Sequence, residues 1–261
     1  MNEEVKKLID NFKIIANKKW IKSVSKSFGS IGITFEKELD KSPDALYFPD
    51  YYGTEIKCTS RYSRYPLFLF TVAFDGPSFP EINRIVEKYG YPDKTYPNKK
   101  VMFEKVSCNK KNLVNNQYKF KLEVDENEEK LFLCVYGLDD ELIERESFVY
   151  LKTIEEHLTL KLNRLAVVSA STKTIDDEKY FRYYKIDIYN LISFERFLRL
   201  LKIGVIEVNL ISRISKSGND SGRYRNKNLV FSIKKNNIEK LFTNIYSCDN
   251  DLAEIINYNK L

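Results

Sequence analysis

The segment "DYYGTEIK", Asp50 to Lys57, carries two acidic side chains and one lysine at a spacing that suits hydrolysis. Glu55 and Lys57 follow the turn at Gly53 and are two residues apart, so on a strand they point to the same face. The carboxylates of Asp50 and Glu55 and the backbone carbonyl of Ile56 can bind a hard cation, Mg²⁺ or Mn²⁺ in its place. Lys57 can orient or deprotonate an attacking water. These residue types predict a metal-assisted site for phosphodiester hydrolysis.

A third carboxylate and the scarcity of histidine bear on the same chemistry. Glu36 lies in "GSIGITFEKELD", where we expect a short helix, and it would complete the acidic cluster through a second metal or a bound water. His157 is the one histidine of the chain, which excludes zinc mechanisms that need two histidines and leaves no motif for a Ser-His-Asp triad. Hydrolysis would therefore depend on carboxylates and lysine.

The Glu-x-Lys pattern is also compatible with an ordinary protein surface. It occurs again at residues 4–6 and 128–130, in an N-terminal helix and an acidic turn, although neither follows a Pro-Asp. On an exposed hairpin, Glu55 and Lys57 would form a charge pair worth roughly a few tenths of a kcal/mol. The spacing alone does not decide between the two interpretations.

The elements that must position these residues alternate between helix and strand along the chain. Apolar residues at helical spacing predict a first helix from Val5 to Ala16, and Asp50 is expected to end the first of three strands. "DENEE" is expected to form a turn within the β-structure of residues 100–137. The other predicted helices cover "FPEINRIVEKYG", residues 153–163 and a segment from Ser193; the predicted strands cover residues 45–49, 54–60 and 67–74, "LAVVSAST", "YFRYYKIDIY", "VIEVNLISRIS" and "LVFSIKK". This alternation predicts an α/β protein.

Composition and charge indicate a folded chain with a segregated surface. The 261 residues are 43% hydrophobic, enough to fill a core, and the net charge is +6. Residues 123–146 hold ten acidic and two basic side chains, whereas residues 199–240 hold ten basic and three acidic ones. We expect the basic segment to face nucleic acid and the acidic one to face away from it.

Targeting signals and cysteine usage favour a protein that stays where it is made. The start, "MNEEVKKLIDNFKIIANKKW", lacks the apolar core and the cleavage site of a signal peptide, and the apolar runs are too short to span a bilayer. The four cysteines form no CxxC pair, so neither a disulfide framework nor a zinc knuckle is expected. We expect a cytoplasmic protein that makes no membrane contact.

The longer string "GSIGITFEKELDKSPDALYFPDYYGTEIKCTS" resembles the catalytic core of the MvaI/BcnI restriction endonucleases. These are relatives of the mismatch-repair nickase MutH within the PD-(D/E)XK nuclease superfamily. The resemblance rests on "GITFE", which supplies Glu36, and on "DYYGTEIK", which supplies Asp50, Glu55 and Lys57. It continues weakly through "KLNRLAVVSASTK" and the following strand and helix to "GRYRNKNLVFSI".

The resemblance implies a type II restriction endonuclease that cuts double-stranded DNA at a short specific sequence and leaves 5′-phosphate and 3′-hydroxyl ends. Its fold would be a PD-(D/E)XK core with a mixed central sheet flanked by helices, plus a smaller DNA-recognition lobe. Residues 1–110 would form most of the catalytic lobe, and residues 111–261 the remaining core and the recognition lobe, with the lobes interleaved. We expect a monomer with DNA between its lobes, and a methyltransferase encoded nearby rather than a bound subunit.

Base-reading residues are expected in the basic C-terminal segment. Alternation along "VIEVNLISRIS" puts the donor and acceptor types that base edges need on one face of a strand. A following loop and the segment after the catalytic strand would contact bases or phosphates. The predicted set is Glu207, Asn209 and Arg213 on the strand, Arg223, Arg225, Lys227 and Asn228 in the loop, and Arg61 and Arg64 after the catalytic strand.

Each of these positions has an ordinary alternative. The strand and loop could be a solvated basic surface, and Arg61 and Arg64 could cap a sheet edge. The family pattern also differs here, because Asn209 stands where an arginine is expected and "GRYRN" replaces a loop that contains histidine. The resemblance therefore does not imply that this chain recognises the family's target sequence.

Two further functions remain open from the sequence. The first is a MutH-like nicking endonuclease of repair or defence that a partner activates, and gene context would separate it from a restriction enzyme. The second is a DNA-binding protein that has lost catalysis. The intact Asp50, Glu55 and Lys57 speak against this second function.

Overall fold

The computed structural model describes residues 2–40 and 49–251, which fold into two compact units interleaved along the chain. Unit 1 comprises Met1–Leu67, Leu160–Ile192 and Phe242–Leu261; unit 2 comprises Phe68–Thr159 and Ser193–Leu241. The units are interleaved because each of them takes strands from separate parts of the chain. The expected division at residue 110 into a catalytic and a recognition lobe stays a prediction.

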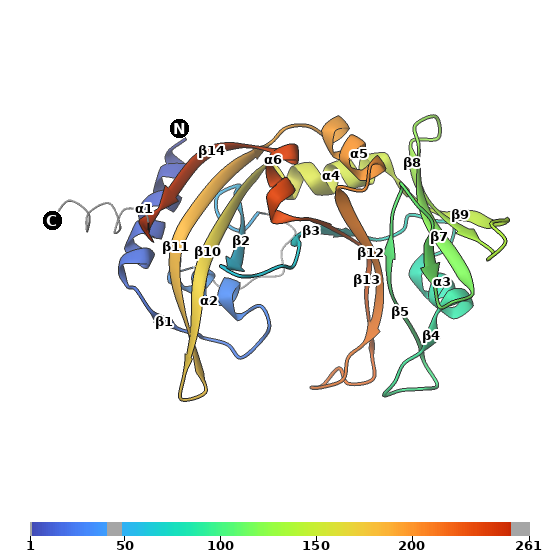
Figure 1. Ribbon diagram of the computed structural model, residues 1–261, viewed down its shortest axis with the longest axis horizontal. Helices are drawn as coiled ribbons and strands as arrows, with labels where there is room; N and C mark the ends of the chain where they lie inside the picture. Colours follow the sequence, from blue (N-terminus) through green and yellow to red (C-terminus); the bar gives the residue numbers. More distant parts are fainter. Residues whose placement is uncertain (1, 41–48, 252–261) are drawn as a thin grey trace. The chain divides into compact units, whose positions relative to one another are not determined.

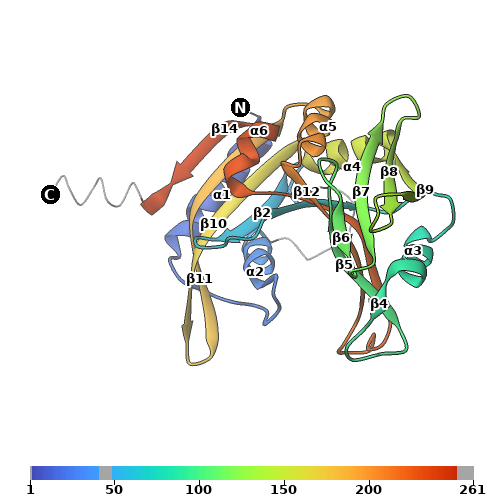
Figure 2. The same ribbon diagram turned by 45° about the vertical axis from the view of Figure 1, so that its right-hand side comes forward.

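Unit 1 is built on a five-stranded mixed sheet. Its path is β1-β11-β10-β2, and β14 also pairs with β11. β10 pairs in parallel with β2 and antiparallel with β11. The two long strands β10 and β11 form the curved ribbon in Figures 1 and 2. The bounds are β1 (Ile21–Lys22), β2 (Glu55–Ser60), β10 (Arg164–Ile175), β11 (Glu178–Leu191) and β14 (Phe242–Asp249).

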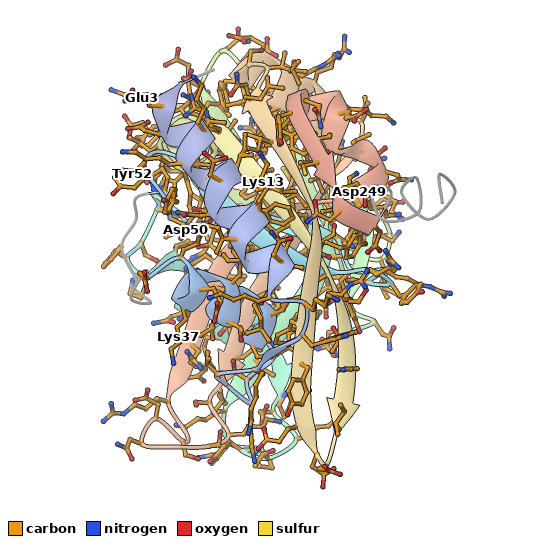
Figure 3. All side chains as sticks on the ribbon, turned by 90° about the vertical axis from the view of Figure 1, so that its left-hand side faces the viewer. Glu3, Lys13, Lys37, Asp50, Tyr52 and Asp249 are labelled. Carbon is orange, nitrogen blue, oxygen red and sulfur yellow. The ribbon has the colours of Figure 1, made fainter. Side chains whose placement is uncertain are left out.

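Two helices complete the core of unit 1. α1 (Glu3–Asn17) follows its N-cap residue Asn2, whose side chain accepts a hydrogen bond from the Glu4 amide at 2.8 Å. Its apolar stripe, which includes Phe12, is buried with residues of β10 and β11. α2 (Ser30–Glu38) packs the Phe35 ring 4.9 Å from the Tyr183 ring. In Figure 3, α1 lies across this unit with Lys13 on it, between Asp50 on one side and Asp249 on the other.

Unit 2 contains two antiparallel β-structures. One is a five-stranded sheet in the order β3-β13-β12-β5-β4, and the other is the four-stranded meander β6-β7-β8-β9. The first five are β3 (Leu67–Val72), β4 (Tyr91–Pro92), β5 (Lys100–Val106), β12 (Ile206–Ile214) and β13 (Tyr224–Ile233). The meander is β6 (Asn112–Val114), β7 (Tyr118–Asp125), β8 (Lys130–Tyr136) and β9 (Leu142–Tyr150).

The helices that belong to unit 2 bury apolar faces in its core. Phe197 of one helix lies 5.8 Å from Phe70 of β3 and 5.7 Å from Phe231 of β13, measured between ring centroids. The helices are α3 (Glu81–Tyr89), α5 (Phe194–Lys202), the 3₁₀ turn η1 (Lys235–Asn237) and α6 (Ile238–Leu241), and α4 (Leu151–Leu162) runs from unit 2 into unit 1. No helix in the described part of the chain is long and apolar enough to cross a membrane.

The predicted α/β fold with a mixed sheet flanked by helices is confirmed, with local corrections. Residues 45–48 of the first predicted strand lie outside the described residues, and Asp50 lies in a bend rather than at a strand end. The predicted loop after β12 is shorter than expected. Arg225, Lys227 and Asn228 belong to β13, because pairing with β12 extends that strand back to Tyr224.

Candidate active site

Strand β2 presents Glu55 and Lys57 on one face at the edge of the unit 1 sheet. The parallel ladder pairs Glu55 with Leu165 and Lys57 with Val167 of β10, so the backbone holds both side chains in register. The Glu55 side chain is only 1% exposed and the Lys57 side chain 18%. The ammonium of Lys57 donates to Oε1 of Glu55 at 2.5 Å. Glu55 is therefore buried beside a half-buried Lys57, and the interpretation as an exposed surface pair is wrong.

A tight turn brings Asp50 to the start of β2. Tyr51 and Thr54 exchange two backbone hydrogen bonds of 2.9 Å each, and the turn between them is closed by Tyr52 and Gly53, both at positive φ. Glycine adopts this backbone without steric cost. As a result Oδ2 of Asp50 accepts a hydrogen bond from the Ile56 amide at 2.9 Å. Figure 3 labels Asp50 and Tyr52 at this turn.

Glu55 is held in an environment that disfavours its charge. Burial raises its pKa, and the negative charge of Asp50 raises it further, while Lys57 lowers it without restoring the ordinary value. Oε2 of Glu55 is buried and has no hydrogen-bond partner in the described structure. A buried oxygen without a partner costs about 1–3 kcal/mol, more when it is charged. This site is therefore incomplete until a donor or a cation reaches Oε2.

Lys161 is a second cation at this carboxylate, and sequence reasoning missed it. It comes from the last turn of α4, and its ammonium lies 3.6 Å from Oε1 of Glu55. Its side chain is 22% exposed. No motif signals this contact, because Lys161 is 106 residues from Glu55 and reaches it only through the fold. A basic residue in the last helical turn is common for reasons of helix stability alone.

Glu36 lies on α2, as predicted, and its charge reaches β2. Burial first, and then the negative charges of Glu36 and Asp50, raise the pKa of Cys58 on that strand. Within residues 2–40 and 49–251, however, no three His, Cys, Asp or Glu side chains form a group that could hold a metal. The described geometry therefore centres on two carboxylates, Asp50 and Glu55.

The predicted reading residues on β12 lie on one face but differ in their contacts. Oε1 of Glu207 lies 3.2 Å from the ammonium of Lys105 on β5 and 3.6 Å from that of Lys234. Asn209 is half-buried, and Arg213 is exposed with its guanidinium 5.2 Å from the centroid of the Phe103 ring. Glu207 is thus already paired, whereas Arg213 extends into solvent.

Strand β13 places a second arginine directly opposite Arg213. Arg225 is its partner in the ladder, and a bulge at Lys227 precedes Asn228, which has a φ of 55°. Arg223 lies just before the strand, where its guanidinium pairs with Asp220 at 3.2 Å and both side chains are exposed. The structure therefore brings Arg213 and Arg225 together on neighbouring strands.

The two arginines predicted after the catalytic strand have different surroundings. The Arg61 amide donates to the Ala170 carbonyl at 2.8 Å, and its guanidinium lies 4.1 Å from the centroid of the Tyr184 ring. It also forms an ion pair with Asp251. Arg64 is exposed and lies outside any strand.

A family model described as the MvaI/BcnI restriction endonuclease family matches residues 9–242. Among solved structures, the chain is similar to a restriction endonuclease MvaI–cognate DNA substrate complex, with a TM-score of 0.86 and 24% identity over 94% of this chain and 100% of that chain. It is also similar to MvaI in the absence of DNA, with a TM-score of 0.60 and 21% identity over 95% of this chain and 98% of that chain. No curated protein matches it.

At identities of 24% and 21%, the similarity to the MvaI structures shows the fold alone. The family model, by contrast, matches the sequence itself. The model spans Glu36, the Asp50 turn, β2 and both arginine-bearing strands β12 and β13. The resemblance carried by "GITFE" and "DYYGTEIK" is therefore confirmed. The chain belongs to the MvaI/BcnI restriction endonuclease family.

Proposed function

We propose that the chain is a metal-dependent type II restriction endonuclease that hydrolyses phosphodiester bonds of double-stranded DNA at a short specific sequence. The observation that carries the proposal is the buried, unpartnered Oε2 of Glu55. It lies beside Lys57 and Asp50 in a chain of a restriction endonuclease family. A buried carboxylate oxygen without a partner destabilises the fold, and a bound ligand would supply the missing partner.

The donor set fits a hard divalent cation. Asp50, Glu55 and the backbone carbonyl of Ile56 would hold Mg²⁺, or Mn²⁺ in its place, and all three are oxygen donors. A cation near Oε2 of Glu55 would also relieve the unfavourable burial that raises the pKa of this residue. When bound, Mg²⁺ would supply positive charge that favours ionised water and stabilises charge on the phosphate.

The chain's own residues would orient the attacking water and the phosphate. Lys57, fixed at 2.5 Å from Oε1 of Glu55, is placed to hold a water or take its proton. The water oxygen bonds to phosphorus as the bond from phosphorus to the 3′ oxygen breaks. The water loses a proton and the 3′ oxygen gains one, which gives the 5′-phosphate and 3′-hydroxyl ends. Glu36 would complete the acidic cluster.

Double-stranded DNA is the proposed substrate, read by exposed arginines of unit 2. MvaI has been solved as a complex with its cognate DNA substrate, which supports the same partner here. Arg213 and Arg225 are adjacent across β12 and β13, and arginine pairs with guanine through O6 and N7. Asn209, Arg223, Lys227, Asn228 and Arg64 would contribute further base or phosphate contacts. We also propose that the enzyme acts as a monomer and that a cognate methyltransferase is encoded nearby.

Plasmid and phage DNA incubated with Mg²⁺ or with EDTA test the catalytic assignment. Wild type should cut only with the metal, and Glu55→Ala and Lys57→Ala should each reduce the rate by about a hundredfold or more. Glu128→Ala and Lys130→Ala are the matched controls, because they remove another Glu-x-Lys pair, which is partly exposed at 3.1 Å. Cleavage by Lys57→Ala at the wild-type rate, or no cleavage by wild type with either Mg²⁺ or Mn²⁺, would overturn the proposal.

A second experiment tests the reading residues. Arg225→Ala should cost about 1–3 kcal/mol of DNA binding and relax the sequence preference at one position, if it contacts a base. Sequencing the ends of digested DNA measures both the preference and the cut position. Lys152→Ala, an exposed lysine of α4, is the control for loss of one positive charge. Identical end sequences and rates for Arg225→Ala and wild type would remove Arg225 from the reader.

A further inference from the structure

Two arginines of unit 1 converge on a single carboxylate, that of Asp251. The Arg61 guanidinium pairs with Oδ2 and the Arg182 guanidinium pairs with Oδ1, so each oxygen has its own cation. Asp251 follows β14 and is the last residue that the structure describes. Its amide donates to Oδ1 of Asp249 at 3.1 Å, which fixes its position at the end of the strand.

The sheet itself brings the two arginines into one row. The Arg61 amide bonds to the Ala170 carbonyl of β10, and the next residue of β10, Ser171, pairs with Arg182 of β11. Strands lie about 4.8 Å apart, so the two arginine backbones are separated by roughly 10 Å across β10. Long guanidinium side chains can close this gap around one small anion.

A bulge orients the aromatic support of this pair. The β10–β11 register shifts between Ser169 and Ala170, which leaves Tyr184 as the extra residue on β11. Bulges re-aim side chains, and the Tyr184 ring lies 4.1 Å below the Arg61 guanidinium. An arginine stacked on a ring loses less conformational entropy when it binds an anion, because the ring already restricts it.

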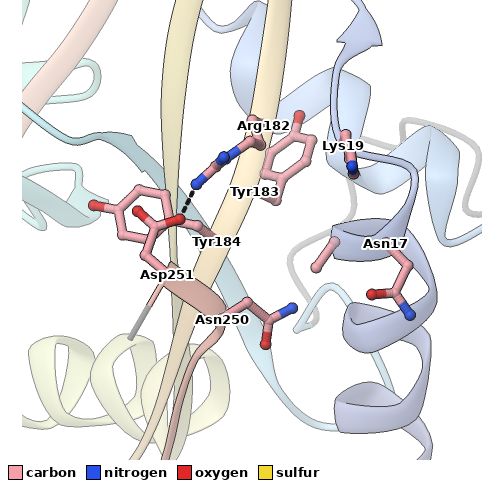
Figure 4. Close-up of a pocket in the computed structure, with 8 residues that line it drawn as sticks. Asn17, Lys19, Arg182, Tyr183, Tyr184, Asn250 and Asp251 are labelled. Carbon is pink, nitrogen blue, oxygen red and sulfur yellow. Dashed lines mark hydrogen bonds and ion pairs between the residues drawn. The ribbon is translucent and has the colours of Figure 1, made fainter. Parts of the chain in front are cut away.

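A pocket of about 60 Å³ opens beside the Arg182 end of the pair. Figure 4 shows Arg182 joined to Asp251, with Tyr184 and Asn250 beside them and Asn17 and Lys19 on the facing part of the pocket. This volume holds several waters, since one water needs about 10–15 Å³ measured in this way. The lining therefore offers polar groups and space around an anion that two arginines already hold.

The Asp251 carboxylate and a DNA phosphate present the same chemistry to these arginines. Each is a singly charged group with two terminal oxygens, and paired guanidiniums recognise both. Both arginine side chains are partly exposed, 36% for Arg61 and 30% for Arg182, so an external anion can reach them. Arg61 lies four residues after Lys57, about 13 Å along an extended chain or about four base-pair rises.

We propose that Arg61 and Arg182 form a backbone-phosphate site for DNA, and that Asp251 occupies this site when DNA is absent and is displaced when it binds. This inference rests on the proposed function, since the displacing ligand is the DNA substrate. It adds Arg182 to the DNA contacts and makes Asp251 an internal competitor. The Asp251 carboxylate keeps both arginines paired when DNA is absent. DNA must displace it to bind, which lowers the affinity of the free enzyme for DNA.

Binding of a fluorescein-labelled duplex of mixed sequence in EDTA, followed by anisotropy across a salt series, tests the inference. Asp251→Asn should tighten binding by about fivefold at low salt. Arg182→Gln should weaken binding and reduce the slope of log K against log salt by about 0.9, the value for one phosphate contact. In the double variant the gain from Asp251→Asn should shrink, because its competitor role needs Arg182.

Two exposed residues of α1 provide matched controls for charge. Asp10→Asn makes the same charge change as Asp251→Asn, and Lys13→Ala the same as Arg182→Gln, and both side chains are more than half exposed. Thermal unfolding by circular dichroism checks that each variant is folded, and Arg182→Lys replaces Arg182→Gln if the latter is not. Arg182→Lys keeps the charge and loses the bidentate geometry, so it should weaken binding without changing the salt slope.

The outcomes separate this inference from the proposed function. The competitor role is refuted if Asp251→Asn binds the duplex no more tightly than Asp10→Asn. It is also refuted if Asp251→Asn tightens binding by the same factor in the Arg182→Gln background. Either result would hold even when wild type still cuts DNA. If wild type cuts no DNA with Mg²⁺ or Mn²⁺ but Asp251→Asn and Arg182→Gln behave as expected, the site stands and the proposed chemistry falls. Absence of duplex binding by wild type and Asp251→Asn alike refutes the phosphate site, and absence of cleavage in addition refutes both.

Discussion

Two buried clusters of carboxylates and cations, one in each unit, use similar residues in opposite ways. In unit 1, Glu55 faces two lysines, Lys57 and Lys161, through a single oxygen. In unit 2, Arg84 of α3 bridges Glu81 on its own helix and Glu144 on β9. Each cluster removes carboxylates from water, and the difference lies in how completely their oxygens are paired.

The unit 2 cluster is fully satisfied. Burial opposes ionisation of Glu144, but hydrogen bonds from Arg84, Lys88 and Tyr89 outweigh it and lower its pKa to about 2. Glu81 accepts further bonds from Ser147 at 2.7 Å and from the Ser78 amide at 3.1 Å, and its pKa is also lowered. These contacts lock α3 onto the meander.

The Glu55 cluster leaves one oxygen without a partner, and the pKa of this residue is raised. Cations are present in both clusters, so the number of cations does not explain the difference. A completed network stabilises a fold, whereas an incomplete one of the same composition is suited to a ligand.

Breaking the unit 2 network should have the largest effect on stability. Arg84→Met leaves two buried carboxylates without their shared cation, and we expect it to lower the free energy of unfolding by about 3–5 kcal/mol. Urea denaturation measures this change. Lys152→Met removes an exposed partner of Glu156 at 4.0 Å and should cost about 0–1 kcal/mol. Equal losses for the two variants would contradict the assignment of the network as structural.

Metal binding should stabilise the unit 1 cluster. Mg²⁺ at about a hundredfold over its Kd should add about 2.7 kcal/mol to the free energy of unfolding, because only the folded chain presents the site. Glu55→Gln and Asp50→Asn should lose this gain, and Glu128→Gln, in an exposed ion pair, should keep it. Thermal unfolding without DNA measures the effect. A gain in Glu55→Gln that equals the wild-type gain would place the metal elsewhere.

The pH dependence of cleavage tests the role of Lys161, and here we expect the smallest of the three effects. Glu55 must be ionised to bind a cation, so its raised pKa makes activity fall as the pH is lowered through that value. The charge of Lys161 lowers this pKa, and Lys161→Met should therefore shift the acid limb of the rate profile to higher pH. Lys161→Arg should restore the limb, and Lys152→Met should leave it unchanged. A wild-type profile for Lys161→Met would show that Lys161 only packs there.

Local patterns predict the helices and the catalytic strand well. The alternation that puts Glu55 and Lys57 on one face depends only on strand geometry. The helix predicted from Ser193 is α5, which Ser193 caps. The position of Asp50 beside β2 could also be predicted, because a tight turn that contains Gly53 joins the two. These features follow from residues within about ten positions of one another.

The remaining features depend on contacts between distant parts of the chain. Lys161 reaches Glu55 only once β10 has paired with β2, so no spacing rule could reveal it. Asn226, Lys227 and Asn228 have turn-like composition, yet pairing with β12 makes them a strand. Arg182 and Asp251 meet because β14 pairs with β11, which places Asp249 opposite Lys185. Tertiary pairing overrides local preference at each of these positions.

The parallel pairing of β2 with β10 also determines when Glu55 and Lys57 can take their places in the sheet during synthesis of the chain. The ladder joins Glu55 to Leu165, which follows it by 110 residues, and β2 has no other neighbour in the described sheet. A nascent chain that ends before residue 165 lacks the strand that supports Glu55 and Lys57. Under the proposed function, nuclease activity would therefore begin only after β10 has been synthesised and paired with β2.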